Sequence, residues 1–149
     1  MKQREKFRYV EKCLYEYKRN MIALGVLHED LRVEQAGTDV HAQNYQFSFN
    51  FGSEPSNPVQ ARLIKIEQIE GRIKQLERLT KPITKLINDL DTPENLKGSN
   101  NKVMLEILKL MYFGKNNSGV IADELHMAKR TFLRLRRELV YIAMGYLAF

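Results

Sequence analysis

Apolar residues recur every three or four positions through most of this chain, which is the spacing of one face of an α-helix. The pattern is clear in residues 2–24, and Gly25 follows in a place suited to end that helix with a left-handed cap. It returns in residues 59–90 and again in residues 102–113. These stretches predict an all-α fold.

The stretch at residues 59–90 is the most regular, because its apolar residues follow a heptad repeat with members such as Ile69 and Ile83 at d positions. Such a seam pairs with another helix, either across a homodimer interface or back onto the N-terminal helix. Both pairings are open at this point. Pro82 is expected to kink or restart the helix because proline has no backbone N–H, with Thr80 as the cap of the restarted part.

Residues 34–57 break the helical spacing with several Gly, Asn, Ser and Pro residues, so we expect an irregular loop there. Four aromatic residues inside it alternate with polar ones at the period of a half-buried strand: Tyr45, Phe47, Phe49 and Phe51. An isolated strand is not stable. The segment therefore pairs with another protomer, docks on the helices or stays mobile; a stacking platform for single strands is disfavoured because the segment carries only acids.

The C-terminal stretch, residues 118–149, divides into two helical halves around a short break at residues 126–128. One face of the second half is apolar and is expected to be core: Phe132, Leu135, Leu139, Ile142 and Tyr146. Five cations fall within nine residues of the same half: Lys129, Arg130, Arg134, Arg136 and Arg137. Two short helices joined by a turn, with the second one basic, indicate a helix-turn-helix that lays its second helix in the major groove of DNA.

A hydrophilic segment at residues 91–101, with Pro93 and Gly98, is expected to link two units. The first unit, residues 1–90, is a helical hairpin or coiled coil that contains the irregular loop. The second unit, residues 102–149, begins with a packing helix and continues into the helix-turn-helix.

The charge distribution favours a polyanionic partner. The net charge is +6, and residues 99–149, with 8 cations and 4 acids, are the most basic part of the chain. The N-terminal helix also has a basic face, which fits either a second DNA contact or a solvated surface. Because the chain has no long apolar run and no apolar signal segment near residue 1, we expect a cytoplasmic protein without a membrane partner.

Catalytic, metal and cofactor chemistry find no support in the sequence. His28, His41 and His126 share no metal-ligand spacing with each other or with carboxylates. Cys13 is the single cysteine, which excludes an internal disulfide and a thiolate zinc cluster. A glycine-rich phosphate loop is also missing. We therefore expect no enzyme, no metal site and no cofactor.

Three segments resemble a known family: FRYVEKCLYEYKRN near the N-terminus, SNPVQARLIKIEQIEGRI in the middle and IADELHMAKRTFLRLRRELVYIA near the C-terminus. They are similar to the small phage-encoded transcriptional regulators of the ArpU and RinA type. The resemblance implies a regulator of late genes in a phage or prophage, with a DNA-reading unit similar to region 4 of sigma factors. It also implies that base contacts come from the segment after the turn: Lys129, Arg130, Thr131, Arg134 and Arg137.

The expected contacts with double-stranded DNA fall into two groups. Phosphates would be contacted by Lys115, by the helix end at Ser118 and by Arg136. Ser118 would also cap the first helix of the pair. Base edges would be read by Arg130 and Arg134, with Lys129 or Thr131 in support, because the arginine fork matches the two acceptors of guanine. Ala128 starts the second helix without a capping side chain, which costs about 0.5–2 kcal/mol relative to a good cap.

Two other classes of protein remain as alternatives. A packaging protein similar to small terminase subunits also joins a helical DNA-binding unit to a coiled coil, and it would assemble into a ring of many subunits. A pure interaction protein would use its basic face to bind an acidic partner such as the host RNA polymerase. A preferred DNA sequence separates the regulator from both.

Overall fold

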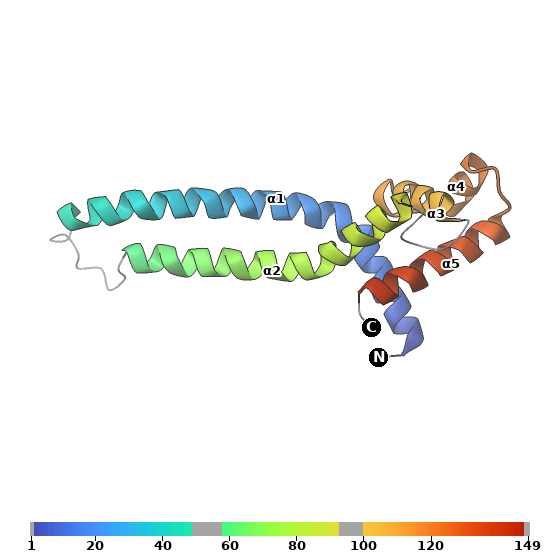
Figure 1. Cartoon of the computed structure of the whole chain (residues 1–149), viewed down its shortest axis with the longest axis horizontal. Helices are drawn as coiled ribbons and strands as arrows, with labels where there is room; N and C mark the ends of the chain where they lie inside the picture. Colours follow the sequence, from blue (N-terminus) through green and yellow to red (C-terminus); the bar gives the residue numbers. More distant parts are fainter. Residues whose placement is uncertain (1, 49–57, 93–99, 148–149) are drawn as a thin grey trace. The chain divides into compact units, whose positions relative to one another are not determined.

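The computed structural model describes residues 2–48, 58–92 and 100–147, and all regular elements within these ranges are helical (Figure 1). In chain order they are α1 (Gln3–Ser48), α2 (Pro58–Asp91), α3 (Asn101–Ile107), the π-helix η2 (Leu108–Phe113), α4 (Ser118–Glu124) and α5 (Lys129–Tyr146). The predicted all-α fold is confirmed. None of these described helices has an apolar stretch long enough to span a membrane.

The chain forms two compact units, and each of the two long helices contributes to both. One unit, called the core unit below, consists of Met1–Asn20 and Arg78–Phe149. The other, called the hairpin unit, is Met21–Glu77. This division differs from the boundary expected at residues 91–101, of which residues 93–99 lie outside the described part of the chain. The reason is that the start of α1 and the end of α2 bury apolar side chains among those of the C-terminal helices.

The core unit has one apolar core to which all its helices contribute. Its fully buried side chains come from the start of α1, the end of α2 and the C-terminal helices: Val10, Leu14, Ile83, Leu86, Leu90, Ile107, Leu108, Tyr112, Ile121, Phe132, Leu139 and Val140. Burying one such aliphatic or aromatic side chain contributes about 1.5–3 kcal/mol. The second half of the heptad seam is thus used inside the core unit, where Ile83 and Leu90 are enclosed.

The hairpin unit is held by the first half of the seam. Ile69 and Ile73 of α2 are buried with Leu24 of α1, and Leu27 and Leu31 pack beside them. In Figure 1 the two helices run side by side in this region. The seam therefore packs back onto the N-terminal helix of the same chain, which is one of the two pairings that the sequence left open.

Helix α1 is much longer than predicted. It continues through Gly25 to Ser48, so the expected cap at Gly25 and the expected loop and strand over residues 34–48 are wrong. Gly25 has no positive φ. Leu27 and Leu31, which follow it in α1, pack against the buried seam residues of α2. That packing outweighs the cost of an interior glycine, about 1 kcal/mol. The rest of the expected loop, residues 49–57, lies outside the described residues.

Helix α2 continues through Pro82. Of the two outcomes expected there, a kink or a restart with Thr80 as its cap, the restart is therefore wrong. Thr80 is buried within the helix, with 2% of its surface exposed. The Thr84 hydroxyl donates a hydrogen bond to the Thr80 carbonyl at 3.0 Å, and the Tyr17 hydroxyl lies 2.7 Å from the Thr84 oxygen. These bonds tie this part of α2 to α1, and tertiary packing there tolerates a proline that an isolated helix would not.

Candidate nucleic-acid interface

Helices α4 and α5 are joined by the short turn that the sequence predicted at residues 126–128. His126 adopts a left-handed conformation, with φ of 55°, and reverses the chain direction. The Met127 amide then donates to the Ala122 carbonyl at 3.0 Å, which closes the turn. Ala128 is extended and makes no side-chain cap, so α5 begins without one, as expected.

The start of α4 differs from the prediction in its cap. The side chain of Asn117, not Ser118, accepts a hydrogen bond from the Val120 amide at 2.9 Å. Asn117 has the extended backbone that a capping residue needs, whereas Ser118 is already the first helical residue. Lys115, in the preceding loop, is exposed and has a left-handed φ of 56°. Neither Lys115 nor Ser118 lines the groove on α5 described below.

Helix α5 has one buried face and one basic face. Its buried residues are Phe132, Leu135, Leu139, Val140, Ala143 and Met144, while Ile142 and Tyr146 of the predicted stripe are half-buried. Lys129, Arg130, Arg134 and Arg137 are exposed on the other side. The core therefore fixes which side of α5 is turned outward.

Three arginines of this outward side converge on one groove. Arg130, Arg134 and Arg137 line it together with Thr131 and Leu133, and its volume is about 430 Å³. Within the described residues, none of the three arginines has a carboxylate partner. The lining of this groove contains no acidic residue, so it presents several guanidinium groups that can bind an anion.

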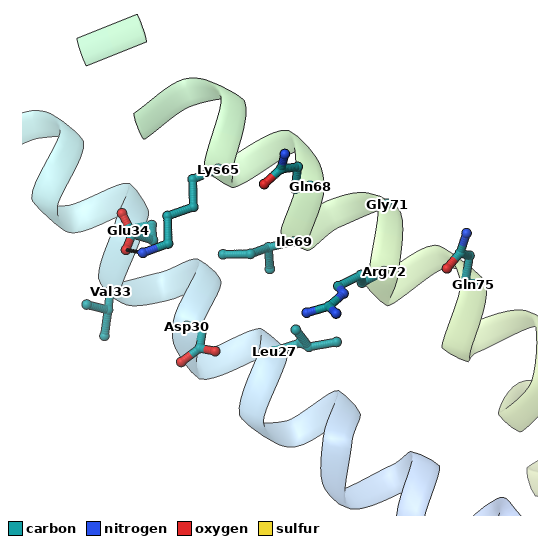
Figure 2. A pocket seen from close by; sticks show the side chains of 10 residues that line it. All are labelled: Leu27, Asp30, Val33, Glu34, Lys65, Gln68, Ile69, Gly71, Arg72 and Gln75. Carbon is teal, nitrogen blue, oxygen red and sulfur yellow. Dashed lines mark ion pairs between the residues drawn. The ribbon is translucent and has the colours of Figure 1, made fainter. Parts of the chain in front are cut away.

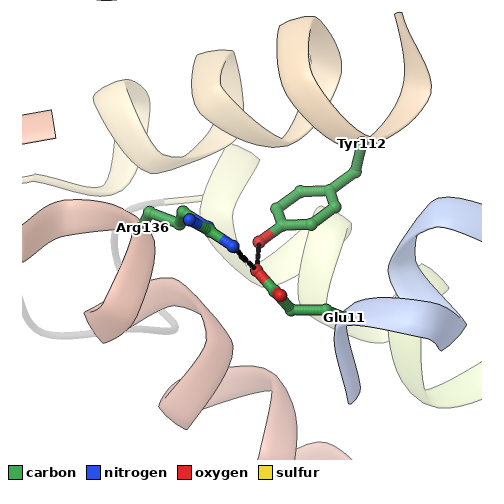
Figure 3. Close-up of polar contacts among 3 residues, drawn as sticks. All are labelled: Glu11, Tyr112 and Arg136. Carbon is green, nitrogen blue, oxygen red and sulfur yellow. Dashed lines mark hydrogen bonds and ion pairs between the residues drawn. The ribbon is translucent and has the colours of Figure 1, made fainter. Parts of the chain in front are cut away.

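Arg136 has a different role from the phosphate contact that the sequence predicted. Figure 3 shows its guanidinium beside Glu11 of α1, with Nε and Nη2 donating to Glu11 Oε1 at 2.8 and 2.5 Å. The hydroxyl of Tyr112, in η2, donates to the same oxygen at 2.8 Å. Because this ion pair already occupies the guanidinium of Arg136, Arg136 is not available as a DNA contact. Sequence spacing could not reveal the pair, since its members are 125 residues apart.

The pKa shifts in the cluster of Glu11, Tyr112 and Arg136 favour the protonation states that its hydrogen bonds require. Burial and the nearby Glu11 carboxylate raise the pKa of Tyr112 above its usual value, so the phenol keeps the proton that it donates. Burial works against the charge of Arg136, but its contacts with Tyr112 and Glu11 outweigh burial and raise its pKa. The cluster joins α1, η2 and α5, and so fixes the orientation of the basic helix.

A second groove in the core unit was missed by sequence reasoning. Arg4 and Arg8 of α1 line it together with Arg137 of α5, and its volume is about 520 Å³. The basic spacing of residues 2–24 was visible in the sequence, but its proximity to α5 was not. This proximity makes the basic surface larger than one helix.

The hairpin unit also contains a groove, which has a different character. Figure 2 shows it between α1 and α2, with Glu34 and Lys65 in contact across it. Its volume is about 800 Å³, and its charged lining is balanced between Asp30 and Glu34 on one side and Lys65 and Arg72 on the other. This balance gives it no preference for an anion.

Metal and nucleophile chemistry have no visible basis in the described part of the chain. No group of three or more His, Cys, Asp or Glu residues there could hold a metal ion. Cys13 is buried in the core unit, and burial raises the pKa of its thiol, which disfavours the reactive thiolate.

No family model, curated protein or solved structure matches this chain. The geometry and electrostatics of the two basic grooves are therefore the observations from which a function can be inferred.

Proposed function

We propose that the protein binds double-stranded DNA in a sequence-specific manner and regulates transcription, with α5 as the reading helix. The observation that carries the proposal is the row formed by Arg130, Arg134 and Arg137. These residues are exposed, lack carboxylate partners among the described residues and share one groove on a helix whose opposite face is buried. A basic helix presented after a tight turn is the arrangement that enters the major groove.

The roles of the individual side chains follow from their places along α5. Residues near the start of such a helix reach the base edges, which assigns base contacts to Arg130 and Arg134, with Lys129 and Thr131 in support. One good arginine contact with guanine contributes about 1–3 kcal/mol of discrimination. Lys115 and the start of α4 at Ser118 are proposed to contact phosphates.

The test begins with in vitro selection of bound DNA from a random pool, for which we expect an enriched motif. Binding of that motif and of random DNA is then measured for Arg134→Ala. Affinity for the motif should fall about 5- to 150-fold, which corresponds to about 1–3 kcal/mol, and affinity for random DNA should fall less. Arg32→Ala is the matched control, because Arg32 is an exposed hairpin arginine paired with Glu29; it should change neither affinity.

Two results would contradict the proposal. A pool that yields no motif would remove sequence specificity. An equal loss on both DNAs for Arg134→Ala would mean that this arginine contacts only phosphate, and base reading through α5 would then have to be abandoned.

The narrower role, a regulator of late genes in a phage or prophage, depends on the family resemblance alone. Contact with host RNA polymerase belongs to the same proposal. A homodimer through residues 59–90 would have to use the outer face of α2, because the heptad seam packs against the rest of the same chain. Light scattering of the purified protein tests the assembly: a monomer or dimer agrees with a regulator, whereas a ring of many subunits would indicate a packaging protein instead.

A further inference from the structure

We infer that the groove between α1 and α5 binds the phosphate backbone of the same DNA duplex, with Arg4, Arg8 and Arg137 as its ligands. This inference depends on the proposed function, because it extends the surface of the reading helix. It assigns a role to the first turns of α1, which the sequence alone left between a DNA contact and a solvated face.

The charges of this groove favour an anion. Arg4 and Arg8 are exposed and one helical turn apart, so they project from the same side of α1 toward the groove that Arg137 also lines. Glu11 lines the groove too, but its carboxylate is already paired with Arg136. Among the described residues, the three groove arginines have no carboxylate partner. The groove therefore carries three uncompensated positive charges.

The two helices hold these charges in fixed positions relative to one another. Phe7 of α1 and Tyr141 of α5 pack edge to face at the groove, with ring centroids 5.8 Å apart. The Glu11–Arg136 pair adds a polar connection between the same helices. Because the arginines are positioned before DNA arrives, binding costs little ordering entropy at the backbone level.

The position of Arg137 along α5 favours a contact with phosphates over a contact with bases. Arg137 follows Arg130 by seven residues, which places it about 10 Å further along the helix axis. The major groove is about 8.5 Å deep, so a helix whose first turn reaches the base edges has its later turns near the rim, where the phosphates lie. Guanidinium groups bind phosphate oxygens in the paired geometry of their fork. Arg4 and Arg8, beside Arg137, are placed for the same rim.

The test is the salt dependence of DNA binding by the double variant Arg4→Gln/Arg8→Gln in the full-length protein. Loss of two phosphate contacts should lower the slope of log K against log salt by about two units on both the selected motif and random DNA. The ratio of the two affinities should stay unchanged, since phosphates carry no sequence information. A thermal melt would verify that the variant folds.

The matched control is Lys102→Gln/Lys109→Gln, which removes the same charge from exposed positions on α3 and η2, outside both basic grooves. Its salt slope should match that of the unmodified protein. The inference is overturned if the protein binds its motif and the Arg4→Gln/Arg8→Gln slope is unchanged, or if both double variants lose slope equally. A reduced affinity ratio in Arg4→Gln/Arg8→Gln would assign these arginines to bases and would also overturn it.

The two proposals fail in different ways. If the unmodified protein enriches no motif and binds no duplex, the proposed function fails and this inference falls with it. If the motif is enriched and Arg134→Ala weakens its recognition, the proposed function stands whatever the result for Arg4 and Arg8.

Discussion

The two units use arginine for opposite purposes. In the hairpin unit, Arg62 and Lys65 of α2 pair with Glu34 of α1 at 3.4 and 3.0 Å, so the cations hold one helix to another. In the core unit, Arg130 and Arg134 of α5 have no carboxylate partner among the described residues. The net charge of +6 does not distinguish these cases. Pairing with a carboxylate does distinguish them, because a cation that already contacts a carboxylate gains less binding free energy from a phosphate.

The core unit contains an instructive exception in Glu11. Its side chain is 15% exposed, as is that of Glu34, and each accepts contacts from cations of another helix. Arg136, the partner of Glu11, is 28% exposed, and Arg62, a partner of Glu34, is 25% exposed. The two glutamates thus play similar parts in separate units, but the Glu11–Arg136 contact is shorter, at 2.5 Å against 3.4 Å for Glu34–Arg62. Only the Glu11 pair belongs to the basic helix.

The largest predicted effect is therefore the loss of the carboxylate charge at Glu11. Glu11→Gln leaves Arg136 partly buried without a counter-charge, and we expect the free energy of unfolding to fall by about 3 kcal/mol, the lower end for buried pairs. DNA affinity should fall as well, because α5 loses its polar connection to α1. Urea unfolding and a DNA titration measure the two effects.

Glu34→Gln is the counterpart in the hairpin unit. The contacts of Glu34 with Arg62 and Lys65 are longer, at 3.4 and 3.0 Å, and Lys65 is 62% exposed, so we expect a loss of about 1 kcal/mol. DNA affinity measured under folded conditions should not change. An equal reduction of DNA affinity by both variants would show that the contrast between the units is mistaken.

A second prediction concerns Tyr112, whose phenol donates a hydrogen bond to Glu11 in the core unit. Tyr112→Phe removes one hydrogen bond to a charged group, and we expect a loss of about 1.5 kcal/mol of unfolding free energy at pH 8. The effect should depend on pH. Burial and Glu11 raise the pKa of Tyr112 in the folded state, while the unfolded chain releases this proton near the ordinary tyrosine pKa of 10.0.

The sign follows from this difference. Below pH 10 the phenol is protonated in both states, and the stability that it contributes is complete. As the pH rises above 10, only the unfolded state loses the proton, so the unmodified protein becomes less stable. Burial and Asp89 raise the pKa of Tyr146 to about 12, which adds to the trend. Urea midpoints at pH 8, 10 and 11 should converge for Tyr112→Phe and the unmodified protein; parallel curves would exclude the raised pKa of Tyr112.

The parts of the site that the sequence predicted correctly depend on local spacing. The break at residues 126–128 and the uncapped start at Ala128 both lie within one short segment of helical period. Contacts between distant segments were not predictable. The pairing of Arg136 with Glu11 and the position of Arg4 beside Arg137 both depend on how α1 packs against α5.

The errors in the fold have a related origin. Glycine and polar residues suggested that the first helix stops at Gly25 and that a loop begins at residue 34, since each disfavours helix in isolation. In the hairpin unit, packing of Leu24 on Ile69 and Ile73 keeps the helix intact, and Glu34 is held by cations from α2. Local propensity could not anticipate the packing of this helix against α2, which begins only at Pro58.

A smaller predicted effect, that of Gly25→Ala, separates a helix that continues through Gly25 from one that ends there. No atom lies within 4 Å of the position that a Cβ would take there, so Gly25→Ala should stabilise the hairpin by about 1 kcal/mol through helix propensity. If Gly25 instead ended a helix in a left-handed conformation, alanine would destabilise the protein. Urea unfolding decides between these signs.

Gly37→Ala tests whether the ion pairs of the hairpin unit contribute to its stability. A Cβ at Gly37 would overlap the guanidinium of Arg62, which must then move away from Glu34. The gain in helix propensity, about 1 kcal/mol, is opposed by the weakened ion pair, which is worth up to about 1 kcal/mol. We therefore expect little net change in unfolding free energy for Gly37→Ala. In a Glu34→Gln background the same substitution should recover the full gain seen at Gly25, because Arg62 no longer has an ion pair to lose; a gain of equal size in both backgrounds would mean that the Arg62–Glu34 pair contributes nothing to stability.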